Sequence, residues 1–143
     1  MRVMGLDIGT KRIGVAVSDE TGTIATGREV VQRKSTEFAV GRIREIVEEY
    51  NVQKIVVGLP VNMDGTEGER ADDSRRFAGR LEEETDLAVE LWDERLSTKE
   101  AEDIMIKADT SRAKRKMVID KIAAQIILQG YLDSSPGREG EDV

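Results

Sequence analysis

The chain has 143 residues, which suits one compact domain, and it carries a formal net charge of −7. It contains no cysteine and no histidine, which excludes disulfides, thiolate nucleophiles, imidazole bases and imidazole metal ligands. Any acid–base or metal chemistry must therefore use carboxylates, lysines or water. No apolar run approaches the roughly 20 residues of a membrane span, and no signal peptide is visible, so we expect a cytoplasmic protein without a membrane partner.

The first third of the chain predicts strands. Residues 3–8 and 13–17 are short apolar runs separated by the turn "GTKR", which predicts an antiparallel hairpin. Residues 23–31 predict a weaker third strand. Residues 36–50 then change to helical periodicity, with Phe38, Ile43, Ile46, Val47 and Tyr50 near one face.

The middle of the chain predicts alternating strands and helices. Residues 54–59, "KIVVGL", have apolar residues at both odd and even positions, which is typical of a strand covered on both faces. A charged helix is expected at 69–84 and a fifth strand at 87–92. This order predicts a mixed α/β sheet with an antiparallel edge, a parallel remainder and helices on both faces.

The last third is more polar. Ser97 and Glu100 have capping-box spacing, which predicts a helix start. Residues 107–116, "KADTSRAKRK", contain five basic residues and one acid, and residues 108–116 are expected to form a mobile loop. A final helix is expected at 117–132. Although the acidic chain is no general polyanion binder, a local basic segment is compatible with nucleic acid.

Three acids fall where the predicted elements should be buried. Asp7 closes the first strand, Glu94 follows the fifth strand in "LWDERLS", and Asp120 lies one turn into the last helix. Its helix neighbours at positions 123, 124 and 127 are apolar, so Asp120 should face the interior. Because the carboxyl ends of parallel strands share one sheet edge, we expect these three carboxylates to converge there.

Converging carboxylates raise one another's pKa. Mg²⁺ or Mn²⁺ removes this conflict because hard cations prefer oxygen ligands. Two such ions about 4 Å apart can activate water and stabilise the leaving oxygen of a phosphodiester without histidine or cysteine. The pattern therefore indicates Asp7, Glu94 and Asp120 as catalytic, metal-binding residues.

Each acid also has an ordinary alternative. Asp7 stands just before a glycine and could be a turn-former. Glu94 could pair at the surface with Arg95 or a nearby lysine. Asp120 could be an acid favoured by the helix dipole near an N-terminus.

Several polar residues are candidates for contacts with substrate phosphates. Lys11 and Arg12 stand beside Asp7 in the predicted hairpin, and Arg95 adjoins Glu94. Asn62, after the fourth strand, would donate to a phosphate oxygen or cap a turn. The basic segment adds four more candidates, whose alternative is a solvated loop: Arg112, Lys114, Arg115 and Lys116. Trp92 is interpreted as a core residue rather than a base-stacking platform.

Four segments together resemble the YqgF family: "DIGTKRIGVAVSD", "VGLPVNMDGTEGERA", "DERLST" and "VIDKIAAQIIL". These are small ribonuclease H-like proteins described as Holliday-junction resolvases and as nucleases that mature the 5′ end of pre-16S rRNA. The resemblance covers residues 3–132. It implies a five-stranded mixed sheet with the first three strands antiparallel, and Asp7, Glu94 and Asp120 at the family's catalytic positions. Trp92 departs from the family, which often has a polar residue there.

The resemblance implies a metal-dependent endonuclease that acts on an rRNA precursor or a DNA four-way junction, as a monomer or a homodimer. Residues 1–133 would form the nuclease domain, and residues 134–143 a disordered acidic tail. Two other functions stay open. "DIGT" also resembles the first phosphate loop of the actin, hexokinase and heat-shock ATPases, although those need two such domains. A nucleic-acid-binding module without catalysis is the other.

Overall fold

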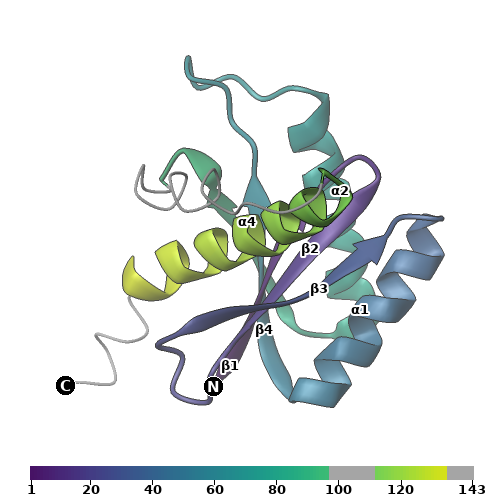
Figure 1. Cartoon of the computed structure of the whole chain (residues 1–143), viewed down its shortest axis with the longest axis vertical. Helices are drawn as coiled ribbons and strands as arrows, with labels where there is room; N and C mark the ends of the chain where they lie inside the picture. Colours follow the sequence, from purple (N-terminus) through teal and green to yellow (C-terminus); the bar gives the residue numbers. More distant parts are fainter. Residues whose placement is uncertain (97–111, 135–143) are drawn as a thin grey trace.

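A five-stranded sheet forms the centre of the computed structural model, which describes residues 1–96 and 112–134, with side chains described at 1–95 and 119–134. The strand order is β3-β2-β1-β4-β5 (Figure 1). The strands are β1 (Arg2–Ile8), β2 (Arg12–Ser18), β3 (Ala25–Gln32), β4 (Val52–Leu59) and β5 (Ala88–Asp93). β1, β2 and β3 pair antiparallel, whereas β4 runs parallel to β1 and β5 parallel to β4. The predicted mixed sheet is confirmed.

Helices cover both faces of this sheet (Figure 1). One face carries α1 (Thr36–Tyr50) and α2 (Glu69–Thr85), and the other carries α4 (Arg112–Ser134). Leu6 belongs to the core under α1 and α2, and Val3 belongs to the core under α4. Two-sided burial explains why β1 and β4 read as continuous apolar runs. None of the helices in the described ranges is long and apolar enough to cross a membrane.

Glycines on the sheet let α4 approach closely. A Cβ atom at Gly5 would lie 2.6 Å from Cβ of Leu128, and one at Gly14 would overlap the backbone carbonyl of Asp120. Real Cβ atoms do not approach so closely, so neither position accepts a side chain without displacing the helix. The two glycines therefore fix the height of α4 above the sheet and bring Asp120 close to β2.

The elements predicted between residues 3 and 92 are all present, each within two residues of its predicted ends. One side chain differs. Phe38 was expected on the apolar face of α1, but it is 46% exposed, and the Lys34 ammonium lies 5.0 Å from its ring centroid. In this part of the helix the buried positions are Ala39 and Val40, so Phe38 lies outside the face that packs on the sheet.

The prediction of a loop up to residue 116 is wrong for residues 112–116, which form the start of α4. Arginine, lysine and alanine are strong helix formers, but this stretch lacks the apolar spacing that marks a buried helix face. The helix also includes Ser134, which was assigned to the predicted tail. Residues 97–111, with the predicted capping box, and residues 135–143 lie outside the described ranges.

Candidate active site

Asp7 and Glu94 meet at the carboxyl edge of the sheet. Asp7 lies near the end of β1, opposite Gly14 of β2, and Glu94 opens the short 3₁₀ helix η1 (Glu94–Leu96) directly after β5. β4 separates β1 from β5, and Gly58 of β4 leaves space for the Glu94 side chain. A Cβ atom at Gly58 would lie 3.2 Å from Cγ of Glu94. A side-chain hydrogen bond joins Glu94 to Asp7.

Burial and mutual repulsion make this carboxylate pair hold a proton. Burial, followed by the charge of Asp7, raises the pKa of Glu94 to about 7. Burial also raises the pKa of Asp7, and the negative charge of Asp120 adds to that rise. Below about pH 7 the pair therefore shares a proton, with Glu94 donating to Asp7. Two half-buried carboxylates in hydrogen-bond contact are unusual away from functional sites.

Asp120 lies on the same side of the sheet but is held by a cation. Its Oδ2 atom accepts a hydrogen bond from Nε of Arg12 at 2.8 Å, and the two side chains are 23% and 27% exposed. Residues 7, 12 and 14 all face α4, because side chains alternate along each strand. The structure therefore brings Asp7 and Glu94 into contact and places Asp120 within electrostatic reach, paired with Arg12.

Of the three predicted metal ligands, Asp7 and Glu94 are arranged to bind a hard cation, and Asp120 is not. Asp7 and Glu94 present converging carboxylate oxygens, which Mg²⁺ and Mn²⁺ prefer. Burial, and then neighbouring acid charge, raises the pKa of both groups, and a cation would offset both effects. Across the described residues, no group of three acids is arranged to hold a metal ion. Asp120 would complete such a group only by leaving Arg12.

Arg70 is a cation of the site that the sequence interpretation missed. It lies in the first turn of α2, and its charge lowers the pKa of both Asp7 and Glu94. One signal could have found it. The helix that follows β4 begins near the carboxyl edge of the sheet, so a cation in its first turn faces the same edge as Asp7.

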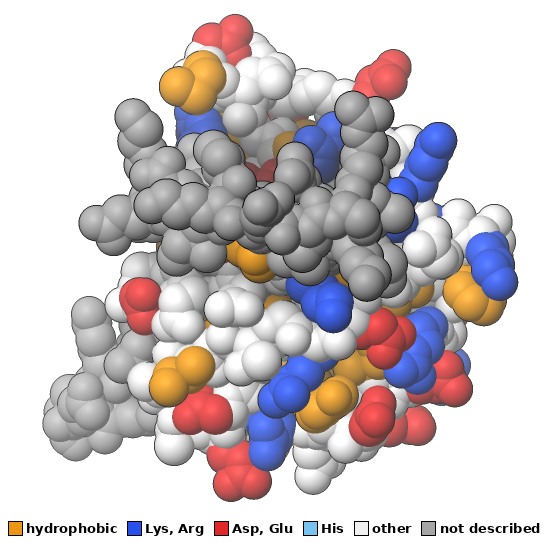
Figure 2. Space-filling model, viewed as in Figure 1, with side chains coloured by type: hydrophobic (Ala, Val, Ile, Leu, Met, Phe, Trp, Pro, Cys, Tyr) orange, Lys and Arg blue, Asp and Glu red, His pale blue; other side chains and the backbone are white. Residues whose placement is uncertain are grey.

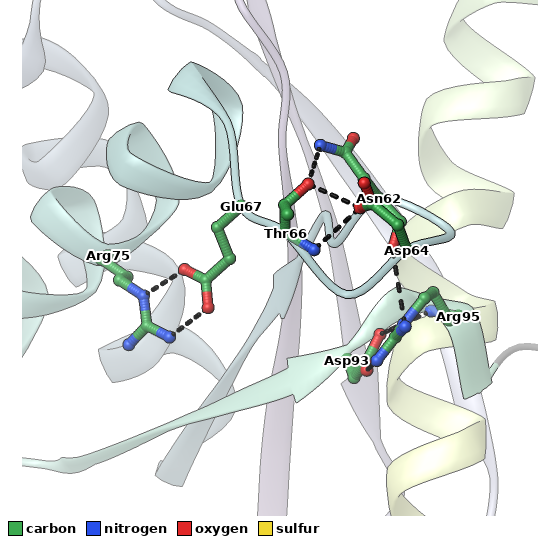
Figure 3. A network of polar contacts seen from close by, with 7 residues as sticks. All are labelled: Asn62, Asp64, Thr66, Glu67, Arg75, Asp93 and Arg95. Carbon is green, nitrogen blue, oxygen red and sulfur yellow. Dashed lines mark hydrogen bonds and ion pairs between the residues drawn. The ribbon is translucent and has the colours of Figure 1, made fainter.

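Two of the residues predicted to contact phosphates, Asn62 and Arg95, have partners within the protein (Figure 3). The Arg95 guanidinium is paired with the carboxylate of Asp93 at 2.8 Å, and it also donates to the backbone carbonyl of Asn62 at 3.5 Å. The Asn62 side chain donates to the hydroxyl of Thr66 at 3.0 Å, a contact within the turn after β4 that fits its turn-capping alternative. These contacts hold the loop after β4 against the end of β5.

The other predicted phosphate contacts are Lys11, Arg12 and the residues of the basic segment. Lys11 is exposed in the turn between β1 and β2, whereas Arg12 is engaged with Asp120. The basic segment belongs to α4 by its backbone, but its side chains lie outside the described residues: Arg112, Lys114, Arg115 and Lys116. Trp92 packs edge-on against Tyr131 of α4 at 5.7 Å between ring centroids, which confirms its core interpretation.

Residues 1–134 match the family RuvX, described as Holliday junction resolvase. A protein of Geobacillus sp. (strain WCH70) is 59% identical over 136 residues, which are 94% of this chain and 99% of that protein. One of Halothermothrix orenii is 54% identical over 133 residues, which are 93% of this chain and 95% of that protein. Both carry the name "Putative pre-16S rRNA nuclease".

Two solved structures share the fold at low sequence identity. Thermus thermophilus RuvC in complex with a Holliday junction substrate has a TM-score of 0.55 at 16% identity, covering 94% of this chain and 96% of that chain. The fowlpox virus resolvase with Holliday junction DNA has a TM-score of 0.58 at 15% identity, covering 94% and 98%. These likenesses confirm the ribonuclease H-like fold class. With its match over residues 1–134 and relatives above 50% identity, the chain belongs to the RuvX (YqgF) family.

Proposed function

We propose that this chain is a divalent-metal-dependent endonuclease for structured nucleic acid, and that its role is 5′-end processing of pre-16S rRNA. The observation that carries this proposal is the half-buried Asp7–Glu94 pair at the carboxyl edge of the sheet. Membership of the RuvX family and the names of the two relatives support the reaction class and the substrate.

Asp7 and Glu94 would hold the metal, with Asp120 joining them on release from Arg12. When bound, Mg²⁺ or Mn²⁺ activates water and stabilises the leaving oxygen of a phosphodiester. Asp7, Glu94 and Asp120 would all be needed to hold two such ions. Their positions on one side of the sheet support this assignment, and the Arg12–Asp120 ion pair is the contact that must open.

The chain's own residues prepare the site in three ways. The raised pKa of Glu94, about 7, means that the pair loses its shared proton near neutral pH and becomes dianionic. Arg70 compensates part of that charge. Lys11, exposed in the turn after β1, is placed to contact the substrate backbone, and such contacts favour a shape over a base sequence.

A Holliday junction is the second candidate substrate. The RuvX family description names this activity, and the fold is shared with two resolvases whose structures contain junction DNA. Resolution of a junction requires two symmetric cuts and therefore a symmetric dimer, whereas an rRNA nuclease can act as a monomer. Sedimentation of the purified protein with and without substrate distinguishes these arrangements.

The deciding experiment is incubation of the purified protein with a pre-rRNA leader and with a four-way junction, each in Mg²⁺, Mn²⁺ or EDTA. We expect metal-dependent cleavage of the leader at a higher rate than the junction, and none in EDTA. The Asp7→Asn variant should bind the leader without cutting it. Binding without cleavage by the unaltered protein in either metal would instead support a non-catalytic binding module.

A further inference from the structure

A polar pocket of about 470 Å³ lies beside the candidate active site. It is formed by three segments: the turn after β1, the start of α1 and the start of α2. Its donor-bearing side chains are three arginines and three hydroxyl residues: Thr10, Arg33, Ser35, Thr36, Arg70 and Arg76. Its volume is in the usual range of ligand pockets.

Arg33 joins the pocket to the strand that bears Asp7. Its guanidinium donates to the backbone carbonyl of Gly9 at 2.9 Å and makes two hydrogen bonds to the Asp73 carboxylate, at 2.6 and 3.0 Å. These hydrogen bonds raise the pKa of Arg33 and lower that of Asp73. Arg33 therefore holds α2 against the turn after β1, and Asp73 balances its charge.

Arg70 and Arg76 carry the rest of the positive charge in the pocket lining, and the charge of each lowers the pKa of Asp73. Both are exposed, and neither forms an ion pair with any residue in the described ranges. Of the acids that line the pocket, Asp73 is engaged by Arg33, which leaves Glu69 against these two arginines. The pocket is therefore net positive, and Arg70 also acts electrostatically on the Asp7–Glu94 pair.

The lining indicates the chemical class of the occupant. None of the described residues that line the pocket is apolar or aromatic, so the pocket offers no aromatic platform for a nucleobase and no surface for an apolar ligand. One guanidinium group can bind two oxygens of the same phosphate through parallel N–H donors. The hydroxyl of Ser35 already accepts from the backbone N–H of Phe38 at 3.0 Å, and its own hydrogen is free to be donated.

We propose that this pocket binds an internal backbone phosphate of the nucleic acid whose neighbouring phosphate lies at the Asp7–Glu94 pair. The inference rests on the proposed nuclease function and adds a second anchoring point to it. Arg70 lines the pocket, and its charge reaches the carboxylate pair, so one strand can engage both points together. The pocket would set the path of the strand through contacts that are independent of base sequence.

The test compares Arg76→Gln with Arg80→Gln, a matched change of charge on the same helix. Arg80 forms surface ion pairs with Glu37 and Glu84 at 3.5 and 3.7 Å and does not line the pocket. Binding of a fluorescent pre-rRNA leader is measured by anisotropy in EDTA, so that cleavage does not interfere. We expect Arg76→Gln to weaken binding about tenfold, and to reduce the slope of log K against log salt by about one. Arg80→Gln should change neither.

A second arm distinguishes an internal phosphate from a terminal one. Leaders with a 5′-hydroxyl and a 5′-phosphate should bind equally, and both should lose the same affinity in Arg76→Gln. Equal effects of Arg76→Gln and Arg80→Gln, or a loss confined to the 5′-phosphate leader, would overturn the assignment. The experiment can refute either proposal without the other. If Arg76→Gln weakens binding but the unaltered protein never cleaves the leader, only the proposed nuclease function is refuted. Normal cutting with unchanged binding by Arg76→Gln refutes only the pocket.

Discussion

Asp120 of α4 is paired with Arg12 of β2, with 2.8 Å between Oδ2 and Nε. The pair joins a helix to a strand 108 positions away along the chain. The same carboxylate still raises the pKa of Asp7, so Arg12 compensates its charge only in part. Arg12 therefore competes with any cation that would draw Asp120 toward the Asp7–Glu94 pair.

Replacing Arg12 by Gln should make the acids more available to a divalent ion. We expect Mn²⁺ to bind Arg12→Gln a few-fold more tightly than the unaltered protein, and Asp120→Asn more weakly, measured by calorimetry. Because the pair is partly exposed, it should contribute only about 1 kcal/mol to stability, which a double-mutant cycle in urea measures. Weaker Mn²⁺ binding by Arg12→Gln would show that Arg12 supports the site instead of competing for it.

The stability of the fold should depend on the ionisation of Glu94. Its folded-state pKa of about 7 lies above its ordinary value of 4.5, so the folded protein binds the proton more tightly than the unfolded chain. Its contribution is therefore greatest below about pH 4.5 and is lost as the pH rises through about 7.

Glu94→Gln keeps a neutral side chain at every pH and should remove this loss. We expect it to raise the free energy of unfolding at pH 8 by of the order of 1 kcal/mol, and by less at pH 5, in urea titrations at matched ionic strength. Glu48→Gln, an exposed change on α1, is the control. A gain at pH 8 that is no larger than in this control would contradict the assigned pKa.

Activity and stability should separate at the carboxylate pair. Asp7→Asn and Glu94→Gln are each expected to reduce cleavage of the leader more than about a hundredfold, since even outer-shell residues of metal sites cost 10–100-fold. Both variants should keep the melting temperature of the parent or exceed it, because the repulsion between the two acids is removed. Inactive variants that melt well below the parent would indicate a structural role for the pair.

The height of α4 above the sheet can be tested with two glycines. Gly14→Ala should cost about 1–3 kcal/mol or more, because its Cβ atom would overlap the Asp120 carbonyl. Gly41→Ala is the matched control. Gly41 lies inside α1, and a Cβ atom there would have nothing within 4 Å. The substitution should therefore stabilise the protein by about 0.5–1 kcal/mol. Chemical denaturation of both variants measures the contrast, and a neutral Gly14→Ala would refute close helix contact.

Ser74 of α2 has a fully buried hydroxyl without a hydrogen-bond partner among the residues that the structure describes. An unsatisfied buried polar group costs about 1–3 kcal/mol, and alanine is the better helix former. Ser74→Ala should therefore raise the free energy of unfolding by about 1 kcal/mol without changing cleavage. A destabilised Ser74→Ala would mean that the hydroxyl has a bonding role in solution.

The local pattern of apolar and polar residues was sufficient to predict where most of the helices and strands lie. The apolar runs of β1 and β4 and the helical spacing of α1 are properties of neighbouring residues, so their positions could be predicted closely. The positions of Asp7 and Glu94 at the ends of their strands followed in the same way, because parallel strands end at one edge. The start of α4 could not be predicted, since residues 112–116 carry no apolar stripe.

The partner of each charge was decided by the tertiary structure. Arg12 pairs with Asp120 only because Gly14 lets α4 pack close to β2, and Arg95 pairs with Asp93 at the end of β5. Arg70 reaches the site from α2, far from both acids in sequence. The sequence determined which groups can ionise and near which sheet edge they lie. Electrostatic pairing depends on distances of a few ångströms between side chains from separate elements, which only the packing of α2 and α4 on the sheet sets.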